Sequence, residues 1–219
     1  MSHTVDGTLG APGSRQAQKL RTRQLLMSAS LELLERQSLS SLGLREVTRA
    51  AGISPAAFYR HFSDIADLGV ALVEETLGSL HGMIGAILAD TGDSEERIER
   101  TVGLIARHVQ AQPAHFRFIV RERHGGVAPV REAIAAQLRR FADEVGTALA
   151  AEEASKGWSE EDLRMLGGVY VGHMVMTAAD LLEAMEQDPG SPRSAVRTAA
   201  RIAVRRLRLV TVGRRHWLD

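Results

Sequence analysis

Apolar residues recur along this chain at the spacing of one helix face. Leu25, Ala29 and Leu33, together with Leu26 and Leu34, follow the i, i+3/i+4 and i+8 pattern of an amphipathic helix, and charged residues fill the other positions. No stretch alternates apolar and polar residues as a half-buried strand does. The pattern therefore predicts an all-α protein. We expect about nine helices, over residues 16–37, 44–51, 55–61, 64–89, 93–111, 113–124, 127–156, 159–187 and 192–211.

Two of the predicted helices are short and meet at a glycine. Gly52 permits a sharp reversal of the chain, and Ser54 is placed to cap the second helix. Phe58 and Phe62 are four residues apart, so both can anchor this helix to one small core. Two short helices joined by a tight turn form a helix-turn-helix, a motif that indicates DNA binding.

The outward positions of this motif and of the first helix suit contacts with a DNA duplex. Small residues near a helix start allow it to enter the major groove, and basic or hydroxyl side chains reach phosphates or base edges. The candidate DNA-binding residues are Lys19, Arg23, Arg45, Ser54, Ala56, Ala57, Tyr59, Arg60 and His61. The alternative is a compact helical corner with a solvated face, and the pattern alone leaves both interpretations open.

The charge of the chain is balanced overall and uneven along the sequence. Lys+Arg and Asp+Glu both number 27, which taken alone argues against the broad basic surface of a nucleic-acid binder. The net charge is +2 over residues 1–68, −9 over 69–192 and +7 over 193–219, and residues 15–62 carry +5. A basic end and an acidic middle indicate two surfaces with different functions, so the neutral total does not exclude DNA binding.

The short helices also carry a family resemblance. An Ala-Gly turn followed by a helix ending in Tyr-x-His-Phe is typical of the DNA-binding domain of the TetR family of bacterial transcription regulators. The pattern occurs here as Ala51-Gly52 and Tyr59-Arg60-His61-Phe62. The sequence thus resembles this family, and the resemblance implies a regulator that binds a pseudo-palindromic double-stranded DNA operator as a homodimer.

Three segments follow from the motif and from composition. Residues 1–15 are rich in Gly, Ser, Thr and Pro, which predicts a flexible arm. We expect a helix-turn-helix DNA-binding domain over residues 16–63. The resemblance implies that residues 64–219 form a ligand-binding and dimerisation domain.

A second stretch, residues 113–123, is similar to the repressors of bacterial unsaturated fatty-acid synthesis and desaturation. That resemblance implies a long-chain acyl-CoA effector, whose anionic head group needs arginines. Arg117, Arg121 and Arg123 are the candidates. Their alternative role is a salt-bridge network to Glu74 and Glu75 that links the two domains, and the sequence favours neither role.

The acidic middle of the chain is the place for an apolar effector cavity. Flexible methionine side chains suit an adaptable ligand site, so the set as a whole is compatible with a cavity, although for each apolar residue taken singly an ordinary core position is favoured. The candidate lining residues are Met83, Ile87, Ile105, Phe141, Val145 and Met174.

The last two long helices are the expected dimer interface, because useful affinity needs two copies of the motif on one duplex face. An apolar stripe with small residues is expected to form it: Leu163, Leu166, Gly167, Tyr170, Val171 and Met174. Arg193, Arg197, Arg201 and Arg205 follow at intervals of four residues. A solvated helix face, a weak DNA contact and a site for a phosphate-rich ligand are all compatible with this arginine stripe.

Several function classes lack their sequence signals. The chain contains no cysteine, which excludes disulfides and thiol nucleophiles, and the spacing of His108, His115 and His124 does not match a metal-ligand set. No Gly-x-Ser-x-Gly elbow, phosphate-binding loop or HExxH motif occurs. We therefore expect no enzyme activity, no cofactor and no metal. Without a run of about 18 apolar residues we expect no membrane span, and the polar start and absent cysteines suggest the cytoplasm.

These observations predict a cytoplasmic TetR-type repressor, associated with the nucleoid when bound, that is controlled by a hydrophobic effector and regulates fatty-acid metabolism. One alternative is a regulator of the same type that senses an unrelated hydrophobic small molecule. The other is an all-helical enzyme or adaptor that does not use the motif for DNA.

Overall fold

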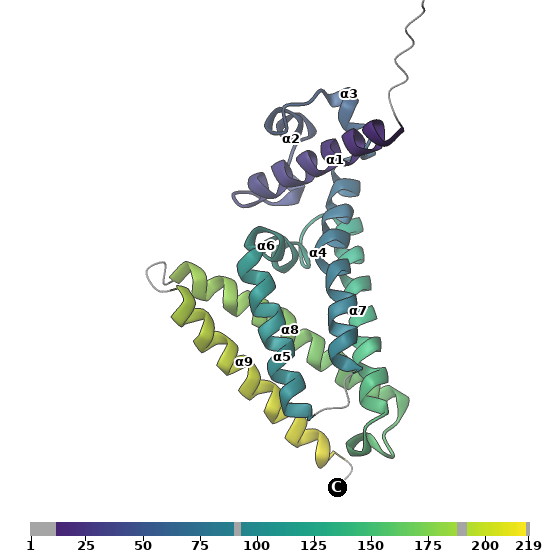
Figure 1. Ribbon diagram of the computed structural model, residues 1–219, viewed down its shortest axis with the longest axis vertical. Coiled ribbons are helices and arrows are strands. Elements are labelled where there is room, and N and C mark those ends of the chain that lie inside the picture. The colour runs from purple at the N-terminus through teal and green to yellow at the C-terminus, as the bar shows by residue number, and fades with distance from the viewer. Residues whose placement is uncertain (1–11, 90–92, 188–191, 218–219) are drawn as a thin grey trace, which may run out of the picture.

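The computed structural model describes residues 12–89, 93–187 and 192–217, and all regular structure within them is helical. This confirms the all-α prediction. The elements, drawn in Figure 1, are α1 (Pro12–Leu34), η1 (Leu39–Ser41), α2 (Leu44–Ala50), α3 (Pro55–Phe58), α4 (Ile65–Leu88), α5 (Ser94–Ala111), α6 (Pro113–Glu122), α7 (Ala128–Ala150), η2 (Glu153–Ser155), α8 (Glu160–Gln187) and α9 (Pro192–Arg215).

The largest differences from the predicted boundaries lie at helix ends. The helix expected to reach residue 37 ends at Leu34, and the one expected to reach 156 ends at Ala150. In both places a short 3-10 helix follows after a few residues. Periodicity overestimated the length of α7, whereas α1 begins at Pro12, four residues before its predicted start. Helix α1 thus includes residues 12–15 of the segment expected to be a flexible arm, and residues 1–11 of that segment lie outside the described residues.

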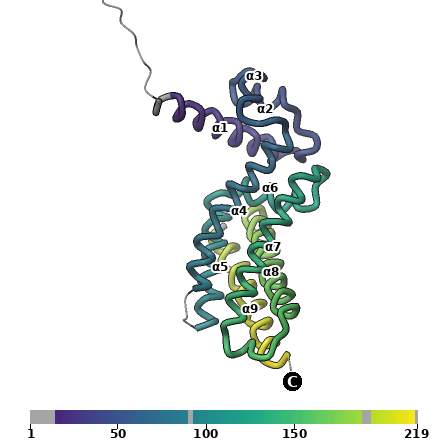
Figure 2. Tube along the Cα trace, turned by 90° about the vertical axis from the view of Figure 1, so that its right-hand side faces the viewer, coloured from purple at the N-terminus to yellow at the C-terminus, as the bar shows by residue number. Residues whose placement is uncertain are grey.

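The helices form a small unit and a long bundle. Helices α1 to α3 lie together at one end of the molecule, and α4 runs from them down along α7 (Figures 1 and 2). In the bundle, α8 packs between α7 and α9, while α5 packs on both α8 and α9. Helix α6 packs on α1, and α4 also contacts α1 through the Gln24–Glu75 hydrogen bond, so both helices connect the bundle to the small unit.

One hydrophobic core extends through both parts of the molecule. In the small unit, Val47 and Phe58 are fully buried and Phe62 is nearly so. Leu39 of η1 and Leu68 at the start of α4 continue this core towards the bundle. The two phenylalanines thus anchor the second helix of the motif in the way their spacing predicts.

Helix α8 combines an apolar composition with a tight crossing. By length and composition alone it could cross a membrane, a weak criterion that the core helices of many soluble proteins also meet. Its Gly167 lies against α7 so closely that an added Cβ atom would come within 2.2 Å of the Ala142 carbonyl oxygen. The apolar residues of α8 thus serve contacts inside the protein on this face.

The apolar stripe predicted for the dimer interface was placed on the wrong face of α8. Leu166, Gly167 and Val171 are buried against the protein's own helices, because α8 is apolar on more than one side. The exposed apolar side chains are instead those of Met165, Val169 and Met176 on α8 and Ile202, Leu209 and Val212 on α9.

Candidate functional site

The turn between α2 and α3 has the geometry that its residues require. Gly52 has φ +67°, a left-handed conformation that glycine adopts without steric cost. The Ser54 hydroxyl accepts a hydrogen bond from the Ala57 backbone N–H at 3.2 Å, and Pro55 occupies the first helical position. The local sequence therefore begins α3 at a defined angle to α2.

Around α3 the structure exposes most of the predicted DNA-binding residues. Tyr59 is 62% exposed, the largest exposure of an aromatic side chain in the described residues. The other exposed members of the set are Lys19, Arg45, Ser54, Ala56 and Arg60. These side chains therefore lie on the surface of the small unit, where they are accessible to a partner.

Ala57 is a correction to the predicted surface. Its side chain is only 8% exposed, beside the fully buried Phe58. Helix α3 is a single turn, so both positions face the core, and Ala57 contributes packing rather than a DNA contact.

Arg23 and His61 lie at the rim of this surface and are engaged within the protein. The Arg23 guanidinium donates a hydrogen bond to the His61 carbonyl oxygen at 3.2 Å and lies 4.4 Å from the centre of the Phe62 ring. Burial, followed by the nearby charges of Lys19, Arg60 and Arg23, lowers the pKa of His61. Arg23 therefore fastens α1 to the end of the motif, and the His61 ring is neutral near pH 7.

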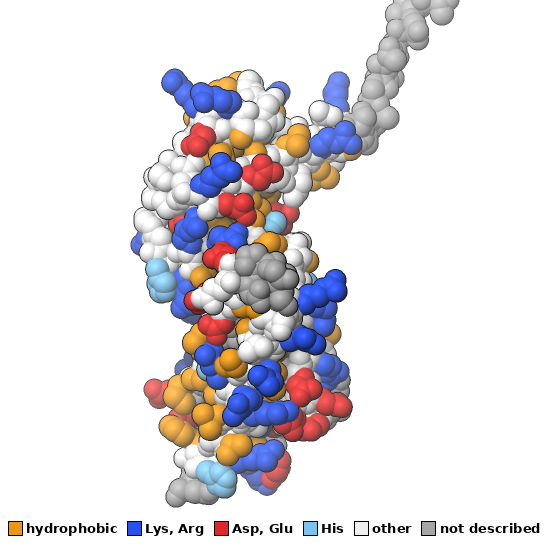
Figure 3. Space-filling view, turned by 90° about the vertical axis from the view of Figure 1, so that its left-hand side faces the viewer, with side chains coloured by type: hydrophobic (Ala, Val, Ile, Leu, Met, Phe, Trp, Pro, Cys, Tyr) orange, Lys and Arg blue, Asp and Glu red, His pale blue; other side chains and the backbone are white. Residues whose placement is uncertain are grey.

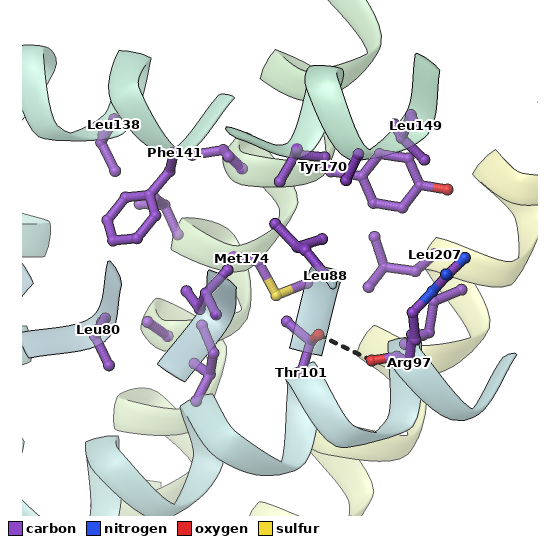
Figure 4. Close-up of a pocket in the computed structure, with 18 of the residues that line it drawn as sticks. Leu80, Leu88, Arg97, Thr101, Leu138, Phe141, Leu149, Tyr170, Met174 and Leu207 are labelled. Carbon is purple, nitrogen blue, oxygen red and sulfur yellow. Dashed lines mark hydrogen bonds between the residues drawn. The ribbon is translucent and has the colours of Figure 1, made fainter. Parts of the chain in front are cut away.

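A cavity of about 140 Å³ lies inside the bundle. All helices from α4 to α9 contribute to its wall, which is mostly apolar. Figure 4 shows Leu80 and Phe141 at one end and Tyr170 with Arg97 at the other. The shape and lining of the cavity are those of a site for an apolar ligand.

Half of the predicted ligand residues reach this cavity. Ile105, Phe141, Val145 and Met174 line it. Met83 and Ile87 pack partly buried against the core outside its wall, since they lie on other faces of α4.

The far end of the cavity carries a charged group that sequence reasoning missed. Glu152 accepts a hydrogen bond from Arg97 through Oε1 and another from Arg214 through Oε2, the latter at 2.6 Å. Next to them the Tyr170 and Thr211 hydroxyls lie 2.8 Å apart. Arg97, Glu152 and Arg214 come from segments far apart in the chain, so no local spacing could have revealed the cluster.

Arg117 and Arg121, two of the predicted head-group residues, do not line the cavity. Arg117 forms ion pairs with Glu35 at 3.0 Å and Glu186 at 2.9 Å. Arg121 donates hydrogen bonds to the carbonyl oxygens of Leu34 and Gln37, at 2.5 and 2.9 Å. Both arginines thus attach α6 to the end of α1.

Arg117 and Arg121 thus take the alternative role, a link between the two domains, but their partners are not the predicted Glu74 and Glu75. Glu74 and Glu75 belong to α4, and Glu75 instead accepts a hydrogen bond from Gln24 at 2.9 Å and lies 3.8 Å from His115. The carboxylate partner from α1 is Glu35, just beyond the helix end.

Glu122 completes the attachment. It is 1% exposed, and its Oε1 accepts a hydrogen bond from the Leu39 backbone N–H at 3.0 Å. On the other side of α6, Phe116, Ile119 and Val120 line the cavity. One short helix therefore contacts both the ligand space and the DNA-binding unit.

The arginine stripe of α9 lies away from the motif. Its members Arg193, Arg197, Arg201 and Arg205 are exposed. The space-filling view shows basic and acidic side chains next to one another on the lower part of this face (Figure 3), and the following Arg206 pairs with Asp180 at 2.6 Å. Helix α9 lies in the bundle, away from α2 and α3 (Figure 1), so this geometry favours a solvated face over a DNA contact.

Within the described part of the chain, no three His, Asp or Glu side chains are placed to hold a metal ion.

Comparison with known proteins gives a sequence match to a protein family and many similar solved structures. Residues 26–72 match the family described as bacterial regulatory proteins, tetR family. The fatty acid degradation regulator FadR from Bacillus halodurans is similar with a TM-score of 0.66 at 15% identity, over 84% of this chain and 94% of that one.

Two further structures are similar over most of their length. A putative TetR-family transcriptional regulator from Syntrophomonas wolfei has a TM-score of 0.66 at 13% identity, over 84% of this chain and 93% of that one. FadR from Bacillus subtilis, solved in complex with stearoyl-CoA, has a TM-score of 0.65 at 12% identity, over 83% of this chain and 97% of that one. At these identities the likeness shows a shared fold.

Proposed function

Because residues 26–72 match the tetR family and the fold is shared with a TetR-family regulator, we propose that the chain is a cytoplasmic transcriptional repressor of the TetR type whose affinity for an operator is controlled by an apolar effector. The observation that carries this proposal is the double role of α6, which lines the cavity and holds the DNA-binding unit. When bound, the protein is expected on the nucleoid.

The proposed DNA contact follows from the exposed residues of the motif. Ala56 near the start of α3 is small enough for close approach to the major groove. Tyr59 and Arg60 reach base edges or phosphates, while Arg45 and Lys19 add positive charge for the phosphate backbone.

A homodimer supplies the second copy of the motif. A duplex presents two half-sites on one face when they lie about one helical turn apart, so two motifs are needed. The exposed apolar residues of α8 and α9 are the surface that we propose for such a dimer, because a two-fold dimer uses the same patch on both subunits. Gly168 and Gly172 of α8 have no other atoms near an added Cβ, which leaves room for a partner helix to approach closely.

The effector acts by favouring one of two arrangements of α6. A ligand that fits the cavity better in one arrangement shifts the population towards it. Because Arg121 and Glu122 tie α6 to the end of α1 and to η1, the shift moves the DNA-binding unit and changes the spacing of the two motifs. A differential affinity of about 1–3 kcal/mol is enough for such control.

A fatty-acid derivative is the first candidate for the effector. The apolar wall and the shared fold with two FadR proteins support it, and one of those was solved with stearoyl-CoA. Control of fatty-acid metabolism would follow. The second candidate is a smaller apolar compound unrelated to fatty acids, which the cavity volume of about 140 Å³ favours.

Selection from a pool of random DNA duplexes tests the proposed function. We expect the full-length protein to enrich a two-fold symmetric sequence, and its affinity to fall steeply as salt is raised. An unchanged pool after repeated rounds would contradict the proposal and would favour an enzyme or adaptor that does not use the motif.

A further inference from the structure

We infer that the effector is a small apolar carboxylic acid, whose carboxylate binds Arg214 beside Arg97 at the far end of the cavity. This inference rests on the proposed function, because it names the ligand of the same cavity. It differs from the acyl-CoA hypothesis in the head group and in the size of the apolar part.

Arg214 is the residue proposed to bind the anionic group of the ligand. It is 5% exposed and lines the cavity, and its Nε–H has no hydrogen-bond partner among the described residues. A buried donor without a partner is costly, and a guanidinium meets a carboxylate best through two parallel hydrogen bonds. A ligand carboxylate at this place would satisfy the unused Nε–H.

Glu152 supplies only part of what Arg214 requires. Its Oε2 accepts one hydrogen bond from Arg214 while its Oε1 accepts one from Arg97, so Arg214 receives one oxygen of Glu152 rather than a two-oxygen pairing. An incoming carboxylate can share Arg214 with Glu152 or take the place of Glu152. The internal carboxylate therefore competes with the ligand for Arg214.

The rest of the wall determines the remainder of the ligand. From Arg97 the cavity continues past Met174 to Leu80 and Phe141 (Figure 4). Its volume of about 140 Å³ is close to that of an engineered cavity of about 150 Å³ that binds benzene. It therefore matches an aromatic ring or a short alkyl chain, whereas an 18-carbon chain would need a much wider cavity.

The groove beside Glu152 disfavours a CoA head group. An outer groove shares Arg97 and Glu152 with the cavity. Its charged lining residues are Asp143, Glu144, Glu152 and Glu153 against Arg97 and Arg140. Because this groove is acidic on balance, it repels the phosphates that CoA would place outside the cavity, while a free acid places its charge at Arg214.

The inference is tested by calorimetric titration of the full-length protein with octanoate, 1-octanol and octanoyl-CoA. We expect octanoate to bind at least about tenfold more tightly than either of the others. Equal affinity for octanoate and 1-octanol would overturn the role of the carboxylate, and tighter binding of octanoyl-CoA would overturn the free acid.

Two substitutions with opposite expected effects sharpen the test. Arg214→Met keeps a long side chain without the charge and should weaken octanoate binding at least about tenfold, with 1-octanol binding unchanged. Glu152→Gln removes the competing charge and should strengthen octanoate binding several-fold. If Arg214→Met does not fold, Glu152→Gln alone tests the inference. Unchanged or weaker octanoate binding by Glu152→Gln would contradict it.

Arg205→Met is the matched control, since Arg205 is exposed on the same helix as Arg214, does not line the cavity and should leave octanoate affinity unchanged. The duplex selection separates the inference from the proposed function. An enriched operator without preference for octanoate overturns the inference alone. Octanoate binding without any enriched duplex overturns the proposed function and supports the carboxylate site.

Discussion

Two pairs of arginines lie at opposite ends of the helical bundle and differ in what they touch. Arg117 and Arg121, on α6, contact the end of α1 through carboxylates and backbone carbonyl oxygens. Arg97 and Arg214 flank Glu152 at the far end of the cavity. The first pair stands in a recognisable sequence stretch but does not line the cavity, whereas Arg97 and Arg214 line it although no local pattern marks them.

The difference shows that the packing partner decides what an arginine does. On α6 the apolar residues Phe116 and Ile119 take the cavity side, which leaves Arg117 and Arg121 on the side of the DNA-binding unit. Arg214 belongs to a helix whose other arginines are mostly exposed, yet it alone among them is buried. In this account the distal pair binds the effector and the proximal pair transmits its effect.

The largest expected effect comes from filling the cavity, which should lower octanoate affinity without changing duplex affinity. Met174→Trp places an indole in the middle of the cavity, so we expect octanoate affinity to fall at least about tenfold while affinity for the selected duplex without effector stays within about twofold. Calorimetry and a duplex titration measure the two quantities. Met174→Leu conserves volume and should retain octanoate binding, and if the Trp variant binds octanoate normally, the ligand lies elsewhere.

Loss of the contact between α6 and the end of α1 should leave octanoate binding intact and remove the effect of octanoate on duplex affinity. Arg121→Met deletes both hydrogen bonds to the end of α1, so octanoate should still bind, but its effect on duplex affinity should drop from about fivefold or more towards none. Duplex titrations with and without octanoate give this ratio. Arg123→Met, two residues further along, is the control, and a ratio preserved in Arg121→Met would mean that the signal takes another route.

A substitution in the helix-turn-helix motif should lower operator affinity without changing octanoate binding or its effect. Tyr59→Ala removes an exposed aromatic side chain from the proposed DNA surface, so we expect operator affinity to fall several-fold with the dimer intact. A gel-shift titration and sedimentation measure these. The ratio of affinities with and without octanoate should be unchanged, as should the operator affinity of Arg193→Ala on α9. An unaltered affinity in Tyr59→Ala would remove Tyr59 from the DNA surface.

The smallest effect concerns the pH dependence of stability. Burial lowers the pKa of His61 from its ordinary 6.5, so the unfolded chain takes up a proton in acid before the folded one does. Stability is therefore full above about pH 6.5 and falls as the pH drops below it towards the lowered value. His173, whose pKa burial also lowers, acts in the same direction.

His61→Gln should make this loss shallower without abolishing it, because His173 still contributes. Urea unfolding midpoints at several pH values between 5 and 8 provide the measurement. If the variant and the unaltered protein lose stability equally between pH 6.5 and 5, His61 is solvated in the folded state and does not carry the effect.

Local patterns predicted most of the fold and part of the site. Helix positions, the glycine turn at Gly52, the cap at Ser54 and the burial of Phe58 and Phe62 all depend on neighbours within a few residues, which the sequence displays directly. Exposure of Tyr59 followed from the same helix. These features need no knowledge of how distant segments meet.

Contacts between segments far apart in the chain could not be predicted from local sequence patterns. Glu152 and Arg214 are 62 residues apart, and Arg121 lies 87 residues from the Leu34 carbonyl that it binds. The face of α8 that is buried could not be read either, because apolar residues such as Val169 and Val171 occur on both sides of it. In each case the deciding contact is with a segment that periodicity does not identify.

The most direct test of the central claim is one set of titrations of the selected duplex, with and without octanoate, for the unaltered protein, Arg214→Met and Arg121→Met. We predict that octanoate changes duplex affinity at least about fivefold for the unaltered protein and has no effect on either variant, while calorimetry shows that only Arg121→Met still binds octanoate. An octanoate effect of full size in both variants would contradict the assignment of the distal arginines to the effector and the proximal ones to its transmission.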